Sequence, residues 1–176
     1  LLVANDTKVL KARMFGYKST GGKVEILLER LLSEQNFLAY IRASHAPKPG
    51  AIIEVGECQI EIIGKNDNLF ECKSNIRAIE LMDKYGNMPI PPYFARDSQK
   101  LDDSRYQTTY ADQDGSVAAP TAGLHIDGVI KSSLAECDIM WKTLTLHIGA
   151  GTFQTVKVVD TCDHVMHYEH FEIDKD

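Results

Sequence analysis

The first seventy-five residues contain short runs of apolar, β-branched and aromatic residues separated by turn-forming residues. Such runs predict β-strands, and the turns between them are rich in Gly, Asn and Pro, as in STGG at 19–22 and GKNDN at 64–68. Six strands are expected, within KVLKARMFGY (8–17), KVEILLERLL (23–32), NFLAYIRA (36–43), AIIEVG (51–56), CQIEIIG (58–64) and LFECK (69–73). Six short strands with tight connections favour a small antiparallel barrel or sandwich.

The segment 23–32 shows how polar and apolar residues alternate in these strands. Lys23, Glu25 and Glu29 alternate with Val24 and Ile26. Successive side chains point to opposite faces of a strand, so the three charged residues are expected together on the polar face. The composition of this segment also fits a helix, but the preceding Gly-Gly and the neighbouring strands favour a strand.

After residue 74 the pattern changes to a mixture of helical and extended segments. Residues 76–86 have helical spacing and end at Gly86. The three prolines within 88–97 predict an extended segment, because Pro fixes φ and restricts the residue before it. The other expected elements are a short helix or turn at 103–112, a helix at 128–136 capped by Asp127, a strand at 139–148 and extended segments at 154–160 and 167–174. The second part is therefore of mixed α and β type, with a boundary near residue 75.

Composition adds limits on the class of protein. The chain has 176 residues, 44% hydrophobic and 25% charged, without an apolar run that could span a membrane. Its net charge of -6 argues against non-specific nucleic-acid binding, yet residues 1–49 hold eight Lys/Arg against four Asp/Glu. The four cysteines form no C-x-x-C pair and are expected to be reduced thiols. Because the chain opens on LLVAN, as if inside a strand, we expect it to be a fragment.

Two stretches place a histidine beside glycine, alanine and threonine, namely APTAGLH (119–125) and HIGAGTF (147–153). The Gly-Ala-Gly run lacks the third glycine of a dinucleotide-binding fingerprint and precedes an expected strand, which excludes a Rossmann loop. Glycine lets a ligand approach the backbone, and a histidine near neutral pH can transfer protons. Gly123 is expected to adopt an unusual φ. Two such loops favour one shared small-molecule pocket, although a glycine-rich bulge and a structural histidine fit the same residues.

Two further groups of residues suggest chemistry less strongly. HVMHYEH at 164–170 spaces three histidines by three, but on a strand His167 points away from His164 and His170, so we expect no metal site. His167 and Glu169 share one face. Tyrosines near prolines at 88–93 and 106–110 could stack on a nucleobase or pack loops against the core.

Eight motifs, taken in order, closely resemble one known family. They are NDTKVLKARMFG (5–16), GGKVEILLERLL (21–32), IRASHAPKPG (41–50), MPIPPY (88–93), YQTTYA (106–111), VAAPTAGLHID (117–127), TLHIGAGTFQTVKV (145–158) and DHVMHYEHFEI (163–173). They resemble the S-adenosylmethionine:tRNA ribosyltransferase-isomerases of queuosine biosynthesis, from Leu1 to about Ile173. The resemblance implies an α+β protein of several domains, in which a small antiparallel β-barrel is inserted into an α/β main domain. The expected division is 1–9 main domain, 10–75 six-stranded barrel and 76–176 main domain, incomplete at both ends.

The resemblance also implies a reaction and its partners. Such enzymes move the ribosyl moiety of S-adenosylmethionine onto 7-aminomethyl-7-deazaguanine at the tRNA wobble position, giving epoxyqueuosine and releasing adenine and methionine. S-adenosylmethionine is then a consumed substrate, and no other cofactor and no metal is expected. The implied partner is tRNA with a GUN-type anticodon, for a cytoplasmic protein without membrane contact that is a monomer when complete.

This chemistry requires proton transfers, for which we expect His125 and His147 as catalytic residues. The residues expected to bind substrate are Asn5, Thr7, Tyr93, Arg96, Tyr106, Thr121, Gly123, Gly149, Gly151 and Thr152. Because family members run beyond both ends of this sequence, the chain is expected to be an incomplete enzyme. The alternatives are a non-catalytic RNA-binding barrel module and an inert fragment.

Overall fold

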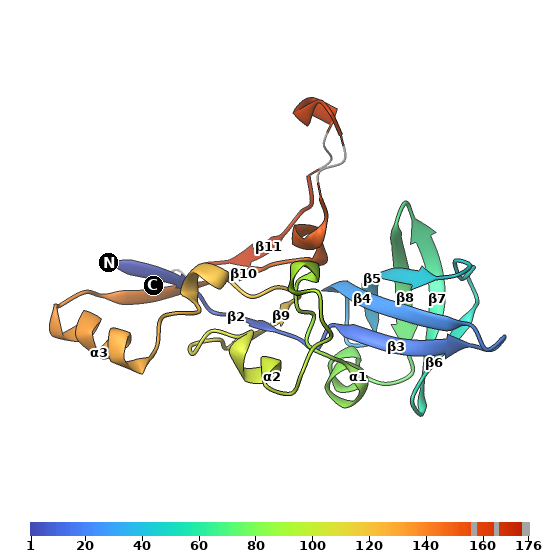
Figure 1. The fold of residues 1–176 in the computed structure, drawn as a ribbon, viewed down its shortest axis with the longest axis horizontal. Helices are drawn as coiled ribbons and strands as arrows, with labels where there is room; N and C mark the ends of the chain where they lie inside the picture. The colour runs from blue at the N-terminus through green and yellow to red at the C-terminus, as the bar shows by residue number, and fades with distance from the viewer. Residues whose placement is uncertain (156–157, 164–165, 174–176) are drawn as a thin grey trace.

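A closed barrel of six antiparallel strands is the largest element of the computed structural model, which describes residues 1–155, 158–163 and 166–173 (Figure 1). Around the barrel the strands follow the order β3-β4-β5-β8-β7-β6. Their bounds are β3 Arg13–Lys18, β4 Lys23–Leu31, β5 Asn36–Ala43, β6 Ile52–Val55, β7 Cys58–Asn66 and β8 Leu69–Ser74. Each overlaps one of the six segments expected from the sequence, and β3, β7 and β8 end one or two residues beyond theirs. The predicted antiparallel barrel is confirmed.

The apolar positions of these strands form the inside of the barrel. In β7, Ile60 and Ile62 are fully buried while the residues between them are exposed. Phe37 of β5 is among the largest fully buried side chains of the chain. Burial of such apolar surface is the main stabilising contribution to the barrel. Because apolar residues recur at every second position of each strand, this burial was predictable from the sequence.

The predicted position of Glu29 is wrong. The register between β4 and β5 shifts between Leu28 and Arg30, so one extra residue stands on β4. Leu28 and Glu29 are consequently both buried, and only 6% of Glu29 is exposed. A β-bulge changes the direction in which side chains point in this way. The order of polar and apolar residues on β4 does not show that a bulge is present.

The remainder of the chain forms two small sheets flanked by short helices (Figure 1). In one sheet, β1 (Leu2–Asn5) pairs parallel to β10 (Trp141–His147), which pairs antiparallel to β11 (His170–Glu172). In the other, β2 (Thr7–Val9) pairs parallel to β9 (Gln113–Ser116). The helices are α1 Ala78–Tyr85, α2 Asp102–Arg105 and α3 Gly128–Glu136, with short 3-10 turns η1 Pro92–Phe94, η2 Thr121–Gly123, η3 Ala150–Phe153 and η4 Thr161–Asp163. The mixed α+β class is confirmed.

Several predicted elements of this second part agree with the structure. Helix α1 and strand β10 lie within their expected ranges, and α2 is the short helix expected near 103–112. Helix α3 begins after Asp127, whose Oδ1 accepts a hydrogen bond from the backbone N–H of Ile130 at 2.9 Å. That bond satisfies one of the unpaired donors of the first helical turn.

Three extended segments differ from expectation. Residues 92–94 form a 3-10 turn, because Pro at its first position has the φ that a helical turn needs and Ala95 closes it in the left-handed region. Within 154–160 the described residues form no strand, and Val159 is fully exposed without a neighbouring strand to pair with. Among residues 167–173, the described part of the last segment, only His170–Glu172 is a strand, since it pairs with three residues of β10.

The barrel and the second part share one hydrophobic cluster. Val117 and Ala150, both outside the barrel strands, are buried in the same cluster as Phe37, and Phe153 packs against it. A separate cluster joins Val9 to the loop after α1. All four cysteines are free, with Cys58 and Cys72 buried and Cys137 and Cys162 exposed. No helix of the described residues is long and apolar enough to cross a membrane.

Candidate active site

A cavity of about 320 Å³ lies where the end of β4 meets β9 and β10. Its lining comes from four separated segments of the chain, brought together by the bulge in β4 and the two small sheets. The lining residues are Glu29, Arg30, Leu31, Asp114, Gly115, His147, Gly149, Tyr168, Glu169 and His170. The carboxylates and imidazoles among them make this cavity the main candidate for proton-transfer chemistry.

His147, the last residue of β10, is held in a defined orientation. Its Nδ1 shares a hydrogen bond of 2.7 Å with the hydroxyl of Thr7, which is completely buried. The ring stacks on His170 at a centroid distance of 6.2 Å. Burial, and next the neighbouring His170, lowers the pKa of His147 below its ordinary value of 6.5. A neutral, oriented imidazole of this kind can accept a proton at neutral pH.

Gly115 of β9 leaves room for this imidazole. Its φ is +154°, and a Cβ built on it would lie 2.6 Å from Cε1 of His147. Glycine alone satisfies both the backbone conformation and the close approach. The sequence analysis missed Gly115, because nothing in QDGS shows that β10 places a ring against it.

Glu29 brings a buried carboxyl group to the same cavity. Burial is the largest influence on its pKa and raises it, whereas a hydrogen bond from the backbone of Ala150 and the electrostatic influence of the nearby His167 lower it. Its Oε2 atom has no hydrogen-bond partner among the described residues. A buried carboxyl group with a free oxygen beside a cavity is suited to exchange a proton or to accept a hydrogen bond from a ligand.

The backbone of η3 packs against Glu29 through glycine. A Cβ on Gly149 would lie 2.7 Å from Oε1 of Glu29, and one on Gly151 would collide with the ring of His167. At both glycines a side chain of the protein stands where a Cβ would be, while Gly149 also lines the first cavity. The alternative of a glycine-rich bulge is wrong, since residues 150–153 form a 3-10 turn.

A second cavity, of about 340 Å³, collects four of the residues predicted to bind substrate. Tyr93, Tyr106, Thr121 and Thr152 all line it, from η1, the residue after α2, η2 and η3. Tyr106 is buried, which raises the pKa of its hydroxyl to about 12, while Tyr93 is largely exposed. Two aromatic rings and two hydroxyls are groups that contact a planar base and a sugar.

The HIGAGTF loop separates the two cavities. His147 and Gly149 line the first cavity, whereas Ile148 and Thr152 line the second. Successive residues of an extended chain point to opposite sides, so one loop contributes to both. The two histidine-containing loops thus meet at the second cavity, where Thr121 and Thr152 lie together.

Comparison with known proteins identifies the family. All of residues 1–176 match the family model described as "Queuosine biosynthesis protein". The chain belongs to this family. An S-adenosylmethionine:tRNA ribosyltransferase-isomerase of Dichelobacter nodosus is 49% identical over 176 residues, which are 100% of this chain and 50% of the relative. One of Thiobacillus denitrificans is 45% identical over 174 residues, 98% of this chain and 51% of the relative.

The chain therefore spans about half the length of the curated relatives it matches. A crystal structure of an S-adenosylmethionine tRNA ribosyltransferase from Thermotoga maritima aligns with a TM-score of 0.40 and 20% identity, over 83% of this chain and 40% of that one. The family resemblance seen in the eight sequence motifs is confirmed by the match over the whole chain.

The remaining predicted residues of this family member lie elsewhere. His125 is exposed and lines neither cavity, so the structure does not bring it together with His147. Asn5 joins β1 to β10, because its amide donates to the carbonyl of Leu146 at 2.9 Å and accepts from its N–H at 3.0 Å. Arg96 makes two hydrogen bonds to Asp102, of 2.7 and 2.9 Å, which hold the pKa of that carboxyl at about 2.

Gly123 does not have the unusual φ expected for it. Its φ is not positive. The hydroxyl of Tyr110 occupies the place where a Cβ would stand. Glycine is required at this position by the packing of Tyr110, and only the tertiary structure reveals that contact.

The histidine-rich segment at 164–170 contributes Tyr168, Glu169 and His170 to the first cavity. His164 lies outside the described residues. His170 pairs with Glu172 at 3.1 Å. Among the residues that the structure describes, no group of three or more His, Cys, Asp or Glu is placed to hold a metal ion.

Proposed function

We propose that the chain is the part of a tRNA ribosyltransferase-isomerase in which Glu29 and His147 transfer protons. The substrates would be S-adenosylmethionine and a tRNA of GUN-type anticodon that carries 7-aminomethyl-7-deazaguanine at the wobble position. Epoxyqueuosine in tRNA, adenine and methionine would be the products. The observation that carries this proposal is one cavity lined by a buried carboxyl and an oriented imidazole, in a member of the queuosine biosynthesis family.

The reaction needs groups of both kinds. A base must remove a proton from the carbon beside the sulfonium, and the departing adenine must take up a proton at the nitrogen that leaves the ribosyl carbon. The lowered pKa of His147 suits it to accept the first proton. The raised pKa of Glu29 suits it to hold and donate a proton. Both shifts favour the uncharged form of the group, a carboxylic acid that can donate a proton and an imidazole that can accept one.

The second cavity would hold the nucleoside. Tyr93 stacks on Phe94 at a centroid distance of 5.0 Å and remains exposed, which leaves a ring face for an adenine base. Thr121 and Thr152 would bind ribose hydroxyls. Residues of the loop from 147 to 153 line both cavities, so the two lie next to each other, and a ligand that holds its base in one would extend around this loop to place its reacting atoms in the other. We infer further that the enzyme works in the cytoplasm as a monomer, with no cofactor besides the consumed S-adenosylmethionine.

Adenine release from S-adenosylmethionine in the presence of substrate tRNA tests this proposal. The assay should use this chain beside a form extended to the length of its relatives. Glu29→Gln and His147→Ala should each lower the rate by about 100-fold or more, as expected for loss of a proton-transfer group. His45→Ala, an exposed histidine in the barrel, is the matched control and should stay within about threefold.

The outcomes separate the candidate roles. If His125→Ala lowers the rate and His147→Ala does not, the catalytic histidine is the exposed one. If tRNA binds but no form releases adenine and S-adenosylmethionine has no effect on binding, the chain is a non-catalytic RNA-binding module. Rates within threefold of wild type for both Glu29→Gln and His147→Ala would contradict the proposed site.

A further inference from the structure

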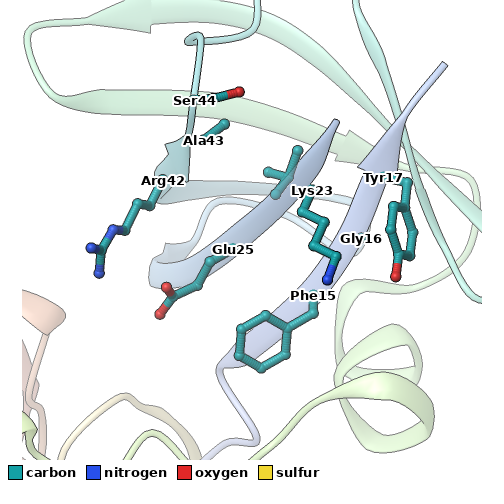
Figure 2. A pocket seen from close by; sticks show the side chains of 9 residues that line it. Phe15, Gly16, Tyr17, Lys23, Glu25, Arg42, Ala43 and Ser44 are labelled. Carbon is teal, nitrogen blue, oxygen red and sulfur yellow. The ribbon is translucent and has the colours of Figure 1, made fainter. Parts of the chain in front are cut away.

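The outer face of the barrel carries two exposed aromatic rings beside basic side chains. Phe15 and Tyr17 of β3 are 55% and 52% exposed, whereas Gly16 between them faces inward against Glu54 and Val55. They border a shallow cavity of about 610 Å³ that reaches over β4 to the end of β5. Figure 2 shows Phe15 and Tyr17 on the same side of β3, with the Lys23 side chain extending between them. We call this surface, made of Phe15, Tyr17, Lys23, Glu25 and Arg42, the barrel face.

Strand register places the charges beside the rings. Lys23 stands opposite Tyr17, and Glu25 stands opposite Phe15 with Arg42 on its other side (Figure 2). Glu25 is neutralised by an ion pair with Arg13 at 3.4 Å. Glu54 stands opposite Tyr17 at the β6 edge of the face. Lys23 and Arg42 are therefore cations without an ion-pair partner among the described residues, with Lys23 beside the two rings and Arg42 on β5, across Glu25 from Phe15 (Figure 2).

This combination fits a single-stranded nucleic acid. Nucleobases stack on exposed aromatic rings irrespective of sequence, and neighbouring Lys and Arg bind the phosphates. A peptide strand could not pair with the barrel, since a closed barrel has no free strand edge. The face also has few aliphatic side chains to bury against a folded partner. The charge and the rings together favour RNA over a protein.

The barrel face lies on the same strand as the candidate active site. Lys23 begins β4, and Glu29 lies six residues further along it. At about 3.3 Å per residue the two are ~20 Å apart, or about six stacked nucleotides of one strand. An unpaired loop of RNA is thus long enough to contact the barrel face while one of its bases occupies the cavity at Glu29.

We propose that the barrel face binds unpaired nucleotides of the RNA substrate, by stacking bases on Phe15 and Tyr17 and holding phosphates with Lys23 and Arg42. The inference rests on the proposed function only in taking that RNA to be the anticodon loop of the substrate tRNA. The overall negative charge of the chain is compatible with it, because the contacts are local and the basic excess lies in the first 49 residues.

Fluorescence anisotropy with a labelled anticodon stem–loop tests the proposal. Phe15→Leu and Tyr17→Leu should each weaken binding by about five- to 150-fold through loss of stacking, while Phe15→Tyr keeps the ring and the affinity. Lys23→Ala and Arg42→Ala should each reduce the slope of log affinity against log salt by about 0.7. Ile63→Ala, an exposed apolar residue on β7, is the matched control and should bind like wild type.

Other outcomes would overturn the proposal. Unchanged binding by both leucine variants, or equal affinity for a fully paired RNA helix, would exclude base stacking on this face. A change in self-association on sedimentation, without a change in RNA affinity, would assign the face to a second copy of the chain.

The adenine-release assay separates this inference from the proposed function. In a form that releases adenine, the leucine variants should raise KM for tRNA and leave kcat within threefold. If no form releases adenine but ring-dependent binding persists, the proposed function fails and the barrel face stands. If adenine is released and the leucine variants leave the KM for tRNA unchanged, the proposed function stands and the proposed role of the barrel face is wrong.

Discussion

At the scale of single residues, the candidate site depends on contacts so close that a larger side chain would collide with its neighbours. Thr7, Gly115 and His147 come from three strands, and their contacts orient one imidazole. Asn5 adds side-chain hydrogen bonds that join β1 to β10 next to this contact. The carboxyl of Glu29 is buried for a different reason, the bulge in β4. Small changes at these positions should have measurable effects.

Gly115→Ala should lower the free energy of unfolding by about 1–3 kcal/mol, because the added methyl group meets the His147 ring and the backbone conformation becomes strained. Denaturant unfolding of the variant measures this. Gly128→Ala at the start of α3 is the control, since nothing lies within 4 Å of its Cβ position and φ is not positive there. It should be neutral or slightly stabilising. Equal effects of the two substitutions would show that the contact with His147 is loose.

Glu29→Gln should change how stability depends on pH. The pKa of Glu29 in the folded chain is raised above its ordinary value of 4.5, so the folded chain keeps a proton that the unfolded chain loses. Its contribution is fully present below pH 4.5 and is lost as pH rises through the folded-state pKa. The stability of Glu29→Gln relative to wild type should therefore rise as the pH increases above 4.5. Urea unfolding at several pH values measures the difference, with Glu57→Gln at an exposed turn as the control. A difference that stays constant with pH would mean that Glu29 is solvated.

At the scale of elements, apolar periodicity and capping account for most of the strands and helices. The barrel strands repeat their apolar residues every second position, and α3 begins at the capping residue the sequence indicates. Prediction from periodicity is wrong where the conformation of an element depends on pairing with another strand. The bulge in β4 depends on its pairing with β5, and the segment after η3 forms no strand in its described residues because no partner strand is beside it.

Asp127→Ala should destabilise α3 by about 1 kcal/mol, through loss of the hydrogen bond that Ile130 donates to its carboxylate. Because α3 buries none of its residues, the effect should be local rather than global. Hydrogen exchange should accelerate at the α3 amides and stay unchanged in the barrel. Asp127→Asn keeps an acceptor and should differ little from wild type. Faster exchange throughout the chain would show that α3 supports the global fold.

At the scale of the whole molecule, the barrel and the second part are joined by packing. Val117, Ala150 and Phe153 contribute to the barrel cluster, and the candidate active site lies at this junction. Its two proton-transfer candidates come from opposite sides of the junction, Glu29 from the barrel and His147 from β10. The geometry of the site therefore depends on both parts remaining folded together.

Phe37→Ala should lower the free energy of unfolding by about 3–5 kcal/mol, since it opens a cavity in the barrel core. Trp141, the single tryptophan, lies in β10 outside the barrel and reports on the second part. Its fluorescence midpoint should fall together with the midpoint from circular dichroism. Phe15→Ala removes an exposed ring and should change stability by less than about 0.5 kcal/mol. A Trp141 midpoint unaffected by Phe37→Ala would mean that the two parts unfold independently.

The sequence by itself determined the six barrel strands and the helix after Asp127. These follow from periodicity and capping, which are local properties of the chain. It also predicted that Tyr93, Tyr106, Thr121 and Thr152 bind substrate, and the structure gathers these four in one cavity. Only the tertiary structure decided that Glu29 turns inward, that Gly115 faces His147 and that His125 lies apart from it. The reason is physical: a bulge, a close approach and a shared cavity each depend on contacts between residues far apart in the chain, and residue order alone does not specify which of them meet.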